Sequence, residues 1–245
     1  MPIPDAAFAD TPELKSRIIQ PEDSRMRLSV ADLDKVDDLA RSQGREYPWR
    51  LSNEALEASR QETMAGRENK DLWVFGYGSL IWDPGLEAVE LRRARTSGYR
   101  RRFCLTQTYD RGSMQHPGLM LALDRGDAQD RCDAIVMRIP AEAADTESGY
   151  LWRREMIAGS YTPGFIDCET TGGSVEAIAF LVSRDLPRYV DWPLERQAKQ
   201  IAGASGAAGT NAAYLENLVT DLQAVGIQDR DMEQLLRLVR DQTDD

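Results

Sequence analysis

The chain has 245 residues, of which 42% are hydrophobic and 29% charged, and its formal net charge at pH 7 is −11. This length suffices for one substantial core, so a single domain with terminal extensions is expected rather than two equal domains. The acidic balance argues against nucleic acid or an anionic membrane as a partner, since both require clustered Lys and Arg. The expected partner is therefore a small-molecule substrate, and no obligate protein partner is evident.

The distribution of special residues narrows the chemistry further. The N-terminal residues show no basic start followed by an apolar run, and no segment approaches the roughly 20 apolar residues that span a bilayer, which predicts a cytoplasmic protein. The scattered Cys104, Cys132 and Cys168 fit reduced core thiols better than a disulfide framework. His116 is the only histidine and lies in a loop-like stretch. No metal or other cofactor is expected, so acid–base chemistry falls to carboxylates or tyrosine.

Residues 1–70 are predicted to be an irregular arm followed by a helical extension. Four prolines among polar residues make residues 1–28 irregular. A helix is then expected from an N-cap at Ser29 to a stop at Gly44, and a second from Ser52 to Gly66.

Residues 71–245 are predicted to form the main domain. Its first part contains apolar runs typical of strands, separated by polar or glycine-bearing turns, at residues 72–76, 88–96, 99–109, 118–124, 133–139 and 175–182. Many strands with few intervening helices indicate the α+β class, with a mixed or antiparallel sheet curled into a small barrel with flanking helices. The arginines between positions 92 and 102 are interpreted as strand residues facing solvent.

Helices are predicted at four places in this domain. One interrupts the strands from about Pro140 to Ala158 and is closed by Gly159. The C-terminal helices begin at about residue 191, where Asp191 is the expected cap of the first. The next starts at Thr210 or Asn211 and stops at Gly226, and Asp231 is the expected cap of the last.

The stretch from Leu72 to Pro84 is the first candidate site. A buried strand ends there in a loop of small residues, which exposes main-chain N–H groups. Two glycines allow backbone conformations forbidden to other residues and let a ligand approach the main chain, so the loop could bind a carboxylate or an oxyanion. The motif is neither a phosphate loop nor a dinucleotide fingerprint. The alternative is that Gly76 and Gly78 only make a tight turn at the end of a strand.

Glu155 is the second candidate. It shares one face of the predicted helix with Leu151, four residues earlier, and a carboxylate on an apolar face is unusual. Burial would raise its pKa toward the range in which a general base works near neutral pH. The alternative is a solvated Glu155 paired with arginine.

Five separated blocks, in order, carry a family resemblance. They are VFGYGSLIW (74–82), GYRRRFCL (98–105), RGSMQHPG (111–118), YLWRREM (150–156) and GTNAAYL (209–215). From about Leu72 to the C-terminus, the chain resembles the ChaC family, the glutathione-specific γ-glutamylcyclotransferases. One departure is Leu119, which stands where many members have Arg after the PG pair, and residues 1–70 precede the resemblance.

The resemblance implies a compact barrel with a pocket lined by the YGSL loop. It implies cleavage of glutathione to 5-oxoproline and Cys-Gly, by attack of the γ-glutamyl α-amine on the side-chain carbonyl. The family's γ-glutamyl-binding loop corresponds to Val74, Phe75, Gly76, Tyr77, Gly78, Ser79 and Leu80, and its catalytic base to Glu155. Two alternatives remain: a cyclotransferase acting on another γ-glutamyl compound, and a non-catalytic γ-glutamyl-binding protein.

Overall fold

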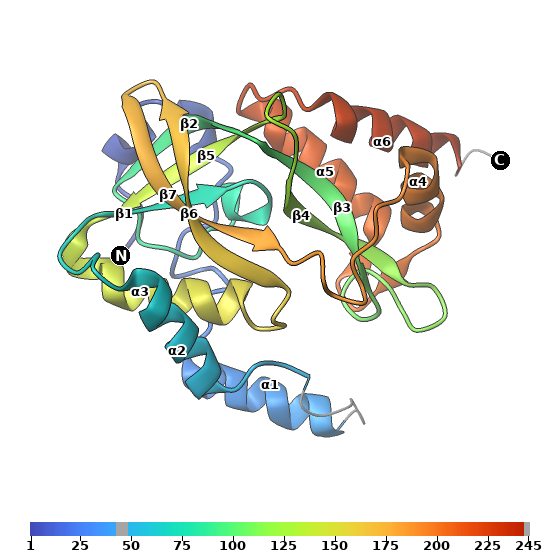
Figure 1. Ribbon diagram of the computed structural model, residues 1–245, viewed down its shortest axis with the longest axis horizontal. Helices are drawn as coiled ribbons and strands as arrows, with labels where there is room; N and C mark the ends of the chain where they lie inside the picture. Colours follow the sequence, from blue (N-terminus) through green and yellow to red (C-terminus); the bar gives the residue numbers. More distant parts are fainter. Residues whose placement is uncertain (43–48, 243–245) are drawn as a thin grey trace. The chain divides into compact units, whose positions relative to one another are not determined.

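A computed structural model describes residues 1–42 and 49–242 (Figure 1). The chain divides into two compact units, Met1–Ala94 with Ile135–Leu181, and Arg95–Ala134 with Val182–Asp245. Within the described residues, none of the helices combines the length and the apolar character that crossing a membrane would require.

The first unit is built around a closed barrel of five strands. They are β1 (Leu72–Gly76), β5 (Arg131–Ile139), β2 (Glu90–Ser97), β6 (Tyr161–Thr170) and β7 (Gly173–Val182), each hydrogen-bonded to the next in this order. β1 pairs antiparallel with β5 and parallel with β7, and the second pairing closes the barrel. The predicted α+β class and the mixed barrel with flanking helices are confirmed.

Apolar side chains fill the barrel and cover it. Ile135, Val136 and Met137 are fully buried in succession on β5, so both faces of that strand are covered. This explains why the strand appears in the sequence as a continuous apolar run rather than an alternating one. On the outside, helix α3 (Ala141–Glu155) contributes Trp152, whose ring packs edge-to-face on Phe180 of β7 at 5.3 Å between centroids.

Two features of this unit differ from the sequence-based expectations. β6 was not predicted, because Pro163 and Gly164 lie within it and both residues are unfavourable inside strands. Helix α3 ends at Glu155, three residues earlier than expected. Gly159 follows with φ of +60°, in the left-handed region that glycine favours.

The N-terminal segment adds two short 3₁₀ helices, η1 (Asp5–Phe8) and η2 (Pro12–Leu14), and two α-helices, α1 (Val30–Ser42) and α2 (Asn53–Met64). Ser52 caps α2 as predicted, since its side chain accepts from the N–H of Ala55. Ser29 stands before α1, and its Oγ accepts from the N–H of Asp32 at 3.2 Å. The predicted stop at Gly44 lies outside the described residues. α2 packs against α3 (Figure 1).

The second unit combines a long hairpin with three helices. The hairpin consists of β3 (Tyr99–Gln107) and β4 (Gly118–Arg125), with a bulge between Phe103 and Leu105. Helices α4 (Leu194–Ala202), α5 (Asn211–Ala224) and α6 (Arg230–Asp241) pack on one another, and α4 also packs on β4 (Figure 1). A two-residue pairing of β8 (Ser205–Gly206) with β9 (Gly209–Thr210) precedes α5.

The helix caps of this unit are partly as predicted. Thr210 caps α5, and Gly226 follows that helix with φ of +73°. The predicted caps at Asp191 and Asp231 are wrong. Pro193 occupies the cap position of α4, and Asp191 instead pairs with Arg102. α6 begins two residues earlier than expected, so that Asp229 caps it by accepting from the N–H of Met232.

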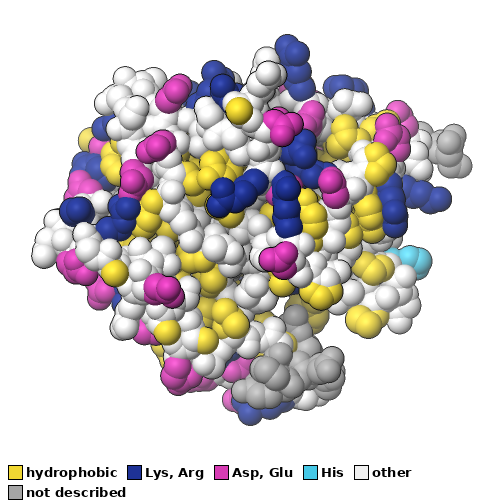
Figure 2. Space-filling model, viewed as in Figure 1, with side chains coloured by type: hydrophobic (Ala, Val, Ile, Leu, Met, Phe, Trp, Pro, Cys, Tyr) yellow, Lys and Arg dark blue, Asp and Glu magenta, His cyan; other side chains and the backbone are white. Residues whose placement is uncertain are grey.

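One charged residue also differs from the sequence-based expectations. The arginines of β2 and β3 were expected to face solvent, but the Arg101 side chain is fully buried and pairs with Asp229. The three cysteines are buried thiols as predicted, and His116 is exposed. On the face shown in Figure 2, basic and acidic side chains are interspersed.

Candidate active site

The glycine-bearing loop directly follows β1. Gly76 ends the strand, and η3 (Ser79–Ile81) follows Tyr77 and Gly78. A Cβ on Gly76 would lie 3.1 Å from Cε of Met137 and 3.2 Å from Cβ of Leu80, so a side chain there would be crowded. Neither glycine of the loop is among those with positive φ. At Gly76 the requirement is therefore space, whereas Gly78 has φ of −142° and ψ of −129°, outside the α and β regions that other residues favour.

The loop presents main-chain donors. The N–H of Ile81 donates to the carbonyl of Gly78 at 2.9 Å, which is the first hydrogen bond of the short helix. The preceding N–H groups, those of Ser79 and Leu80, stand where a helix offers no acceptor. Two neighbouring donors at the end of a strand form a suitable contact for a carboxylate or an oxyanion.

The remaining loop side chains are mostly buried. Val74 and Phe75 are fully buried within β1, and Leu80 is also buried. The Tyr77 hydroxyl donates to the carbonyl of Phe180 at 3.2 Å, which ties the loop to β7. Among the loop residues, Ser79 contacts α3 through its side chain, which accepts from Arg154.

Glu155 is the last residue of α3, and its side chain is only 14% exposed. Leu151, one turn earlier, is buried, as the shared apolar face predicts. The Oε1 of Glu155 lies 3.0 Å from Nε of Arg154. Each of the two alternatives considered for this glutamate was thus partly right, because the side chain is mostly buried and is also paired with arginine.

Arg154 connects Glu155 to the loop. Its guanidinium is buried, donates to Oγ of Ser79 at 2.9 Å, and also donates to the carbonyl of Asp83. Arg154 was not among the predicted site residues. Its position next to Glu155 was visible, but its contact with Ser79, 75 positions away, was not.

Burial controls the ionisation of Glu155. Removal from water raises the pKa of this carboxyl above its ordinary value, and the neighbouring Arg154 opposes part of that rise. A carboxyl whose pKa is raised is a stronger base once ionised, which is the property that general base catalysis near neutral pH requires.

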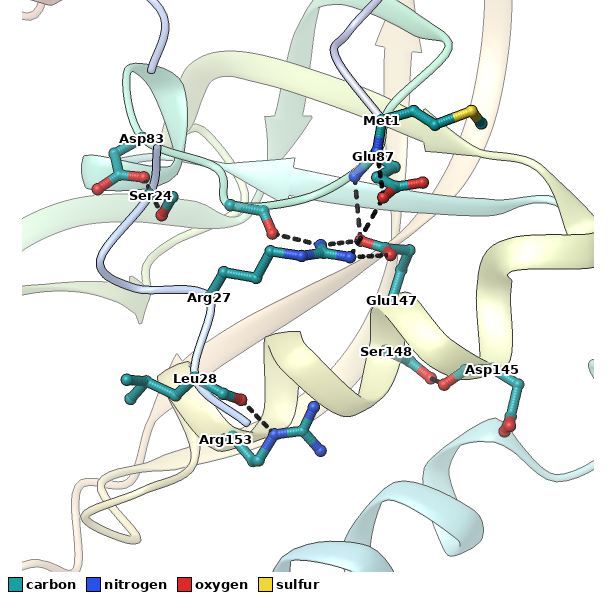
Figure 3. A network of polar contacts seen from close by, with 11 residues as sticks. Met1, Ser24, Arg27, Leu28, Asp83, Glu87, Asp145, Glu147, Ser148 and Arg153 are labelled. Atoms are coloured by element: carbon teal, nitrogen blue, oxygen red, sulfur yellow. Dashed lines mark hydrogen bonds and ion pairs between the residues drawn. The ribbon is translucent and has the colours of Figure 1, made fainter. Parts of the chain in front are cut away.

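The N-terminal arm holds the segment that follows the loop (Figure 3). The Ser24 hydroxyl donates to the Asp83 carboxylate, and Arg27 donates to the carbonyl of Gly85 at 2.8 Å. Arg27 also forms a two-point ion pair with Glu147 of α3, at 2.6 and 2.7 Å. Glu147 further accepts from the N–H of Glu87 at 3.0 Å. The arm is therefore fixed both to the chain after the loop and to the helix that carries Glu155.

In the second unit, Asn211 of one block of the resemblance contacts Leu119, the residue that directly follows another block. The Asn211 side chain accepts from the N–H of Leu119 at 2.6 Å and donates to its carbonyl at 2.9 Å. Leu119 is fully buried. Over residues 1–42 and 49–242, no three His, Cys, Asp or Glu side chains are grouped so that they could hold a metal ion.

Comparison with known proteins identifies the family of the chain. The sequence profile of the ChaC-like protein family matches residues 72–242. The glutathione-specific γ-glutamylcyclotransferase of Escherichia coli K12 is 40% identical over 192 residues, covering 77% of this chain and 82% of the relative. The human glutathione-specific γ-glutamylcyclotransferase 1 is 31% identical over 164 residues, covering 65% and 73% of the two chains. The crystal structure of a glutathione-specific γ-glutamylcyclotransferase from yeast has a TM-score of 0.63 at 23% identity, covering 70% of this chain and 96% of that one.

The barrel and its flanking helices thus have the γ-glutamylcyclotransferase-like fold. Within that fold, the match over residues 72–242 and the identity with the bacterial relative place the chain plainly: it belongs to the ChaC-like family.

Proposed function

We propose that this chain is a γ-glutamylcyclotransferase that cleaves glutathione to 5-oxoproline and Cys-Gly. One observation carries the proposal: the buried carboxylate of Glu155 is joined through Arg154 to Ser79 of the glycine-bearing loop. Family membership supports it, as does the glutathione-specific activity in the names of the bacterial and human relatives.

The reaction is a ring closure. The α-amine of the γ-glutamyl group attacks the side-chain carbonyl carbon, a five-membered ring forms, and the bond to the cysteine nitrogen breaks. Because nucleophile and electrophile belong to one molecule, the step needs correct positioning rather than a covalent enzyme intermediate. An α-ammonium group has a pKa of about 8, and only its neutral form attacks, so a base must take its proton.

Glu155 is the proposed base. Its ionised carboxylate takes a proton from the attacking nitrogen and delivers one to the departing amine of cysteine. One proton is removed and one is returned, so the cleavage consumes no water. The pKa of Glu155, raised by burial, favours this exchange because a more basic carboxylate accepts the proton more readily.

The loop residues 74–80 are the proposed binding site for the γ-glutamyl group. The N–H groups of Ser79 and Leu80 would donate to the substrate carboxylate or to the oxyanion that develops during attack. The absent side chain of Gly78 would let the substrate approach the main chain. Val74 and Phe75, consecutive buried residues of β1, would support the loop from the two faces of the strand.

The roles of the rest of the chain follow from this assignment. We propose that residues 71–245 form the γ-glutamylcyclotransferase-like domain and that residues 1–70 are an extension that braces it, supported by the contacts of Ser24 and Arg27. A cytoplasmic location is also proposed, supported by the three buried free thiols, which suit a reducing compartment.

Mass analysis of the products tests the proposal directly. Purified protein is incubated with reduced glutathione, without added metal or nucleotide, beside a panel of γ-glutamyl amines and dipeptides. The expected result is 5-oxoproline and Cys-Gly from glutathione, with slower turnover of the panel. Faster turnover of another γ-glutamyl compound would identify that compound, and not glutathione, as the preferred substrate. Binding of glutathione without formation of product would show that the chain is a binding protein and not an enzyme.

A further inference from the structure

Arg27 of the N-terminal arm bridges two parts of the first unit that adjoin the proposed catalytic residues. Its Nη1 donates to the carbonyl of Gly85 at 2.8 Å, and Nη1 and Nη2 donate to the two carboxylate oxygens of Glu147 at 2.6 and 2.7 Å. Gly85 belongs to the post-loop segment, residues 82–87, and Glu147 lies on α3, the helix that carries Glu155. Figure 3 shows the Arg27 guanidinium directed at Glu147. One side chain therefore joins the chain after the loop to the helix of the proposed base.

The post-loop segment is built to receive the arm. Gly85 has φ of +61°, and a Cβ there would lie 2.9 Å from Oγ of Ser24, so a side chain at this position would push the arm away. The Ser24 hydroxyl donates to the Asp83 carboxylate. The N–H of Ile19 donates to the carbonyl of Trp82 at 2.7 Å. The arm thus contacts the post-loop segment through both main chain and side chains.

Glu147 receives its donors from outside its own helix. Besides the two bonds from Arg27, it accepts from the N–H of Glu87 at 3.0 Å. Its side chain is 2% exposed, so water does not compete effectively for these bonds. Two parallel charge-assisted bonds fix the relative orientation of the two groups as well as their distance. The pair is therefore a stiff link between α3 and the residues around it.

α3 is joined to the loop and the post-loop segment at two separate points along its length. Arg154, at the end of the helix, donates to Oγ of Ser79 at 2.9 Å and to the carbonyl of Asp83. The second point is Glu147, held through Arg27. A helix held at one point can pivot about it, whereas a second point also fixes its direction. The bridge through Arg27 thus limits how far the end of α3 can move relative to the loop.

We propose that Arg27 is a positioning residue for the cyclotransferase reaction, an inference that rests on the proposed function. It touches no reacting atom. Through Glu147 it fixes the distance between the Glu155 carboxylate and a γ-glutamyl group held by the loop. A displacement of about 1 Å between reacting groups can cost about 10² in rate. Residues before position 72, where the family match begins, therefore contribute to the rate of the chemical step and not only to stability.

The combined variant Arg27→Met with Glu147→Leu tests this role. It removes the bridge without leaving an unpaired buried charge, so much of the stability of the fold is retained. The kcat for 5-oxoproline release should fall about tenfold or more, because Glu155 is less well placed. KM should stay within about twofold, because the loop donors are unchanged. The acidic limb of the pH profile should not move, because Arg154 still pairs with Glu155.

Amide hydrogen exchange measures the same bridge without any turnover. Exchange of residues 79–87 and 147–155 is compared in the parent chain and the combined variant, and should be faster in the variant because the two parts are no longer joined. Glu13→Gln is the matched control, since it removes an ion pair between the same arm and Arg93 of β2. It should leave both kcat and the exchange of these residues unchanged. Urea titration checks that each variant is folded under the assay conditions.

Three results would overturn the inference. A kcat of the combined variant equal to that of the parent chain would show that Arg27 serves stability alone. Unchanged exchange would show that the two parts are held together without the bridge. Equal losses of kcat in Glu13→Gln and in the combined variant would assign the effect to the arm in general. Failure of the proposed function is distinguishable, because it appears in the parent chain as absence of product from glutathione.

Discussion

The Nε of Arg154 lies 3.0 Å from Oε1 of Glu155, so the proposed catalytic base is paired with the residue that precedes it in the chain. The same guanidinium donates to Ser79, which belongs to the proposed substrate loop. Ionisation of the glutamate and the position of the loop therefore depend on one side chain. Two contacts of Arg154 can be tested with different variants. Loss of the contact with Glu155 should change the pH dependence of turnover, and loss of the contact with Ser79 should change substrate binding.

Replacing Arg154 with Met is expected to change the pH profile of turnover. Burial raises the pKa of Glu155 and Arg154 lowers it, so without the guanidinium the pKa rises further. The base must be ionised to act, and the acidic limb of kcat/KM therefore moves to higher pH. Even in the parent chain this limb should lie above the ordinary glutamate pKa of about 4.3. The profile is measured by 5-oxoproline release across the pH range.

Ser79→Ala is the matched variant for this experiment. It removes the 2.9 Å hydrogen bond from Arg154 but keeps the ion pair with Glu155. Its KM should rise while the acidic limb stays in place. An acidic limb that is the same in Arg154→Met as in the parent chain would contradict the proposed coupling.

Glu155→Gln tests the base itself. The amide has nearly the shape of the carboxyl group but cannot accept the proton, so kcat should fall by about 10²–10⁴ while glutathione still binds. Glu142→Gln is the control, because Glu142 lies in the first turn of the same helix and is exposed. Product release is followed by mass analysis and binding by calorimetry. Full activity of Glu155→Gln would exclude the proposed role.

The sequence predicted the elements whose signals are local. The apolar run of β1 and the helical spacing of Leu151 and Glu155 each lie within a few residues, and both were interpreted correctly. β6 was missed because Pro163 and Gly164 oppose a strand locally, whereas pairing with β2 and β7 stabilises it. The strand preference of individual residues does not show which other strands will pair with a segment in the fold.

Partnerships between distant residues were also out of reach. Arg27 and Glu147 are 120 positions apart. Aspartate is a common helix cap, which is why Asp191 was predicted to be one. In the fold its side chain instead pairs with Arg102, 89 positions away in the chain. The arginines of β3 were predicted to face solvent, because the alternation of side chains along a strand does not show that Arg101 forms an ion pair with Asp229. In each case the partner of a charged side chain depends on the fold and not on its sequence neighbours.

Arg27→Met is expected to destabilise the protein through the buried carboxylate that it leaves behind. The Glu147 side chain is 2% exposed and that of Arg27 17%, so the pair is largely shielded from water. Removing one partner of a buried ion pair typically costs about 3–5 kcal/mol, since the remaining charge is uncompensated. The free energy of unfolding is measured by urea titration.

Two further variants separate this pair from a general effect of the arm. Arg25→Met removes a charge from an exposed position of the same arm and should change the free energy of unfolding by less than about 0.5 kcal/mol. Combining Arg27→Met with Glu147→Leu removes both charges and should recover much of the loss, because no unpaired carboxylate remains. Equal losses in Arg25→Met and Arg27→Met would show that the ion pair is not the cause.

The buried thiols should resist alkylation in the folded protein. Burial raises the pKa of Cys104 to about 12 and that of Cys132 to about 11, and the thiolate is the reactive form. Relative to an ordinary thiol of pKa about 8.5, the thiolate fraction near pH 8 is lower by about 10³ at Cys104 and about 10² at Cys132. Labelling with iodoacetamide, followed by peptide mass analysis, measures the rate at each site. The same chain in denaturant provides the reference, where burial is lost and both sites should react as ordinary thiols. Labelling of Cys104 at similar rates in the folded and unfolded chain would mean that the thiol is accessible, contrary to its place in the core.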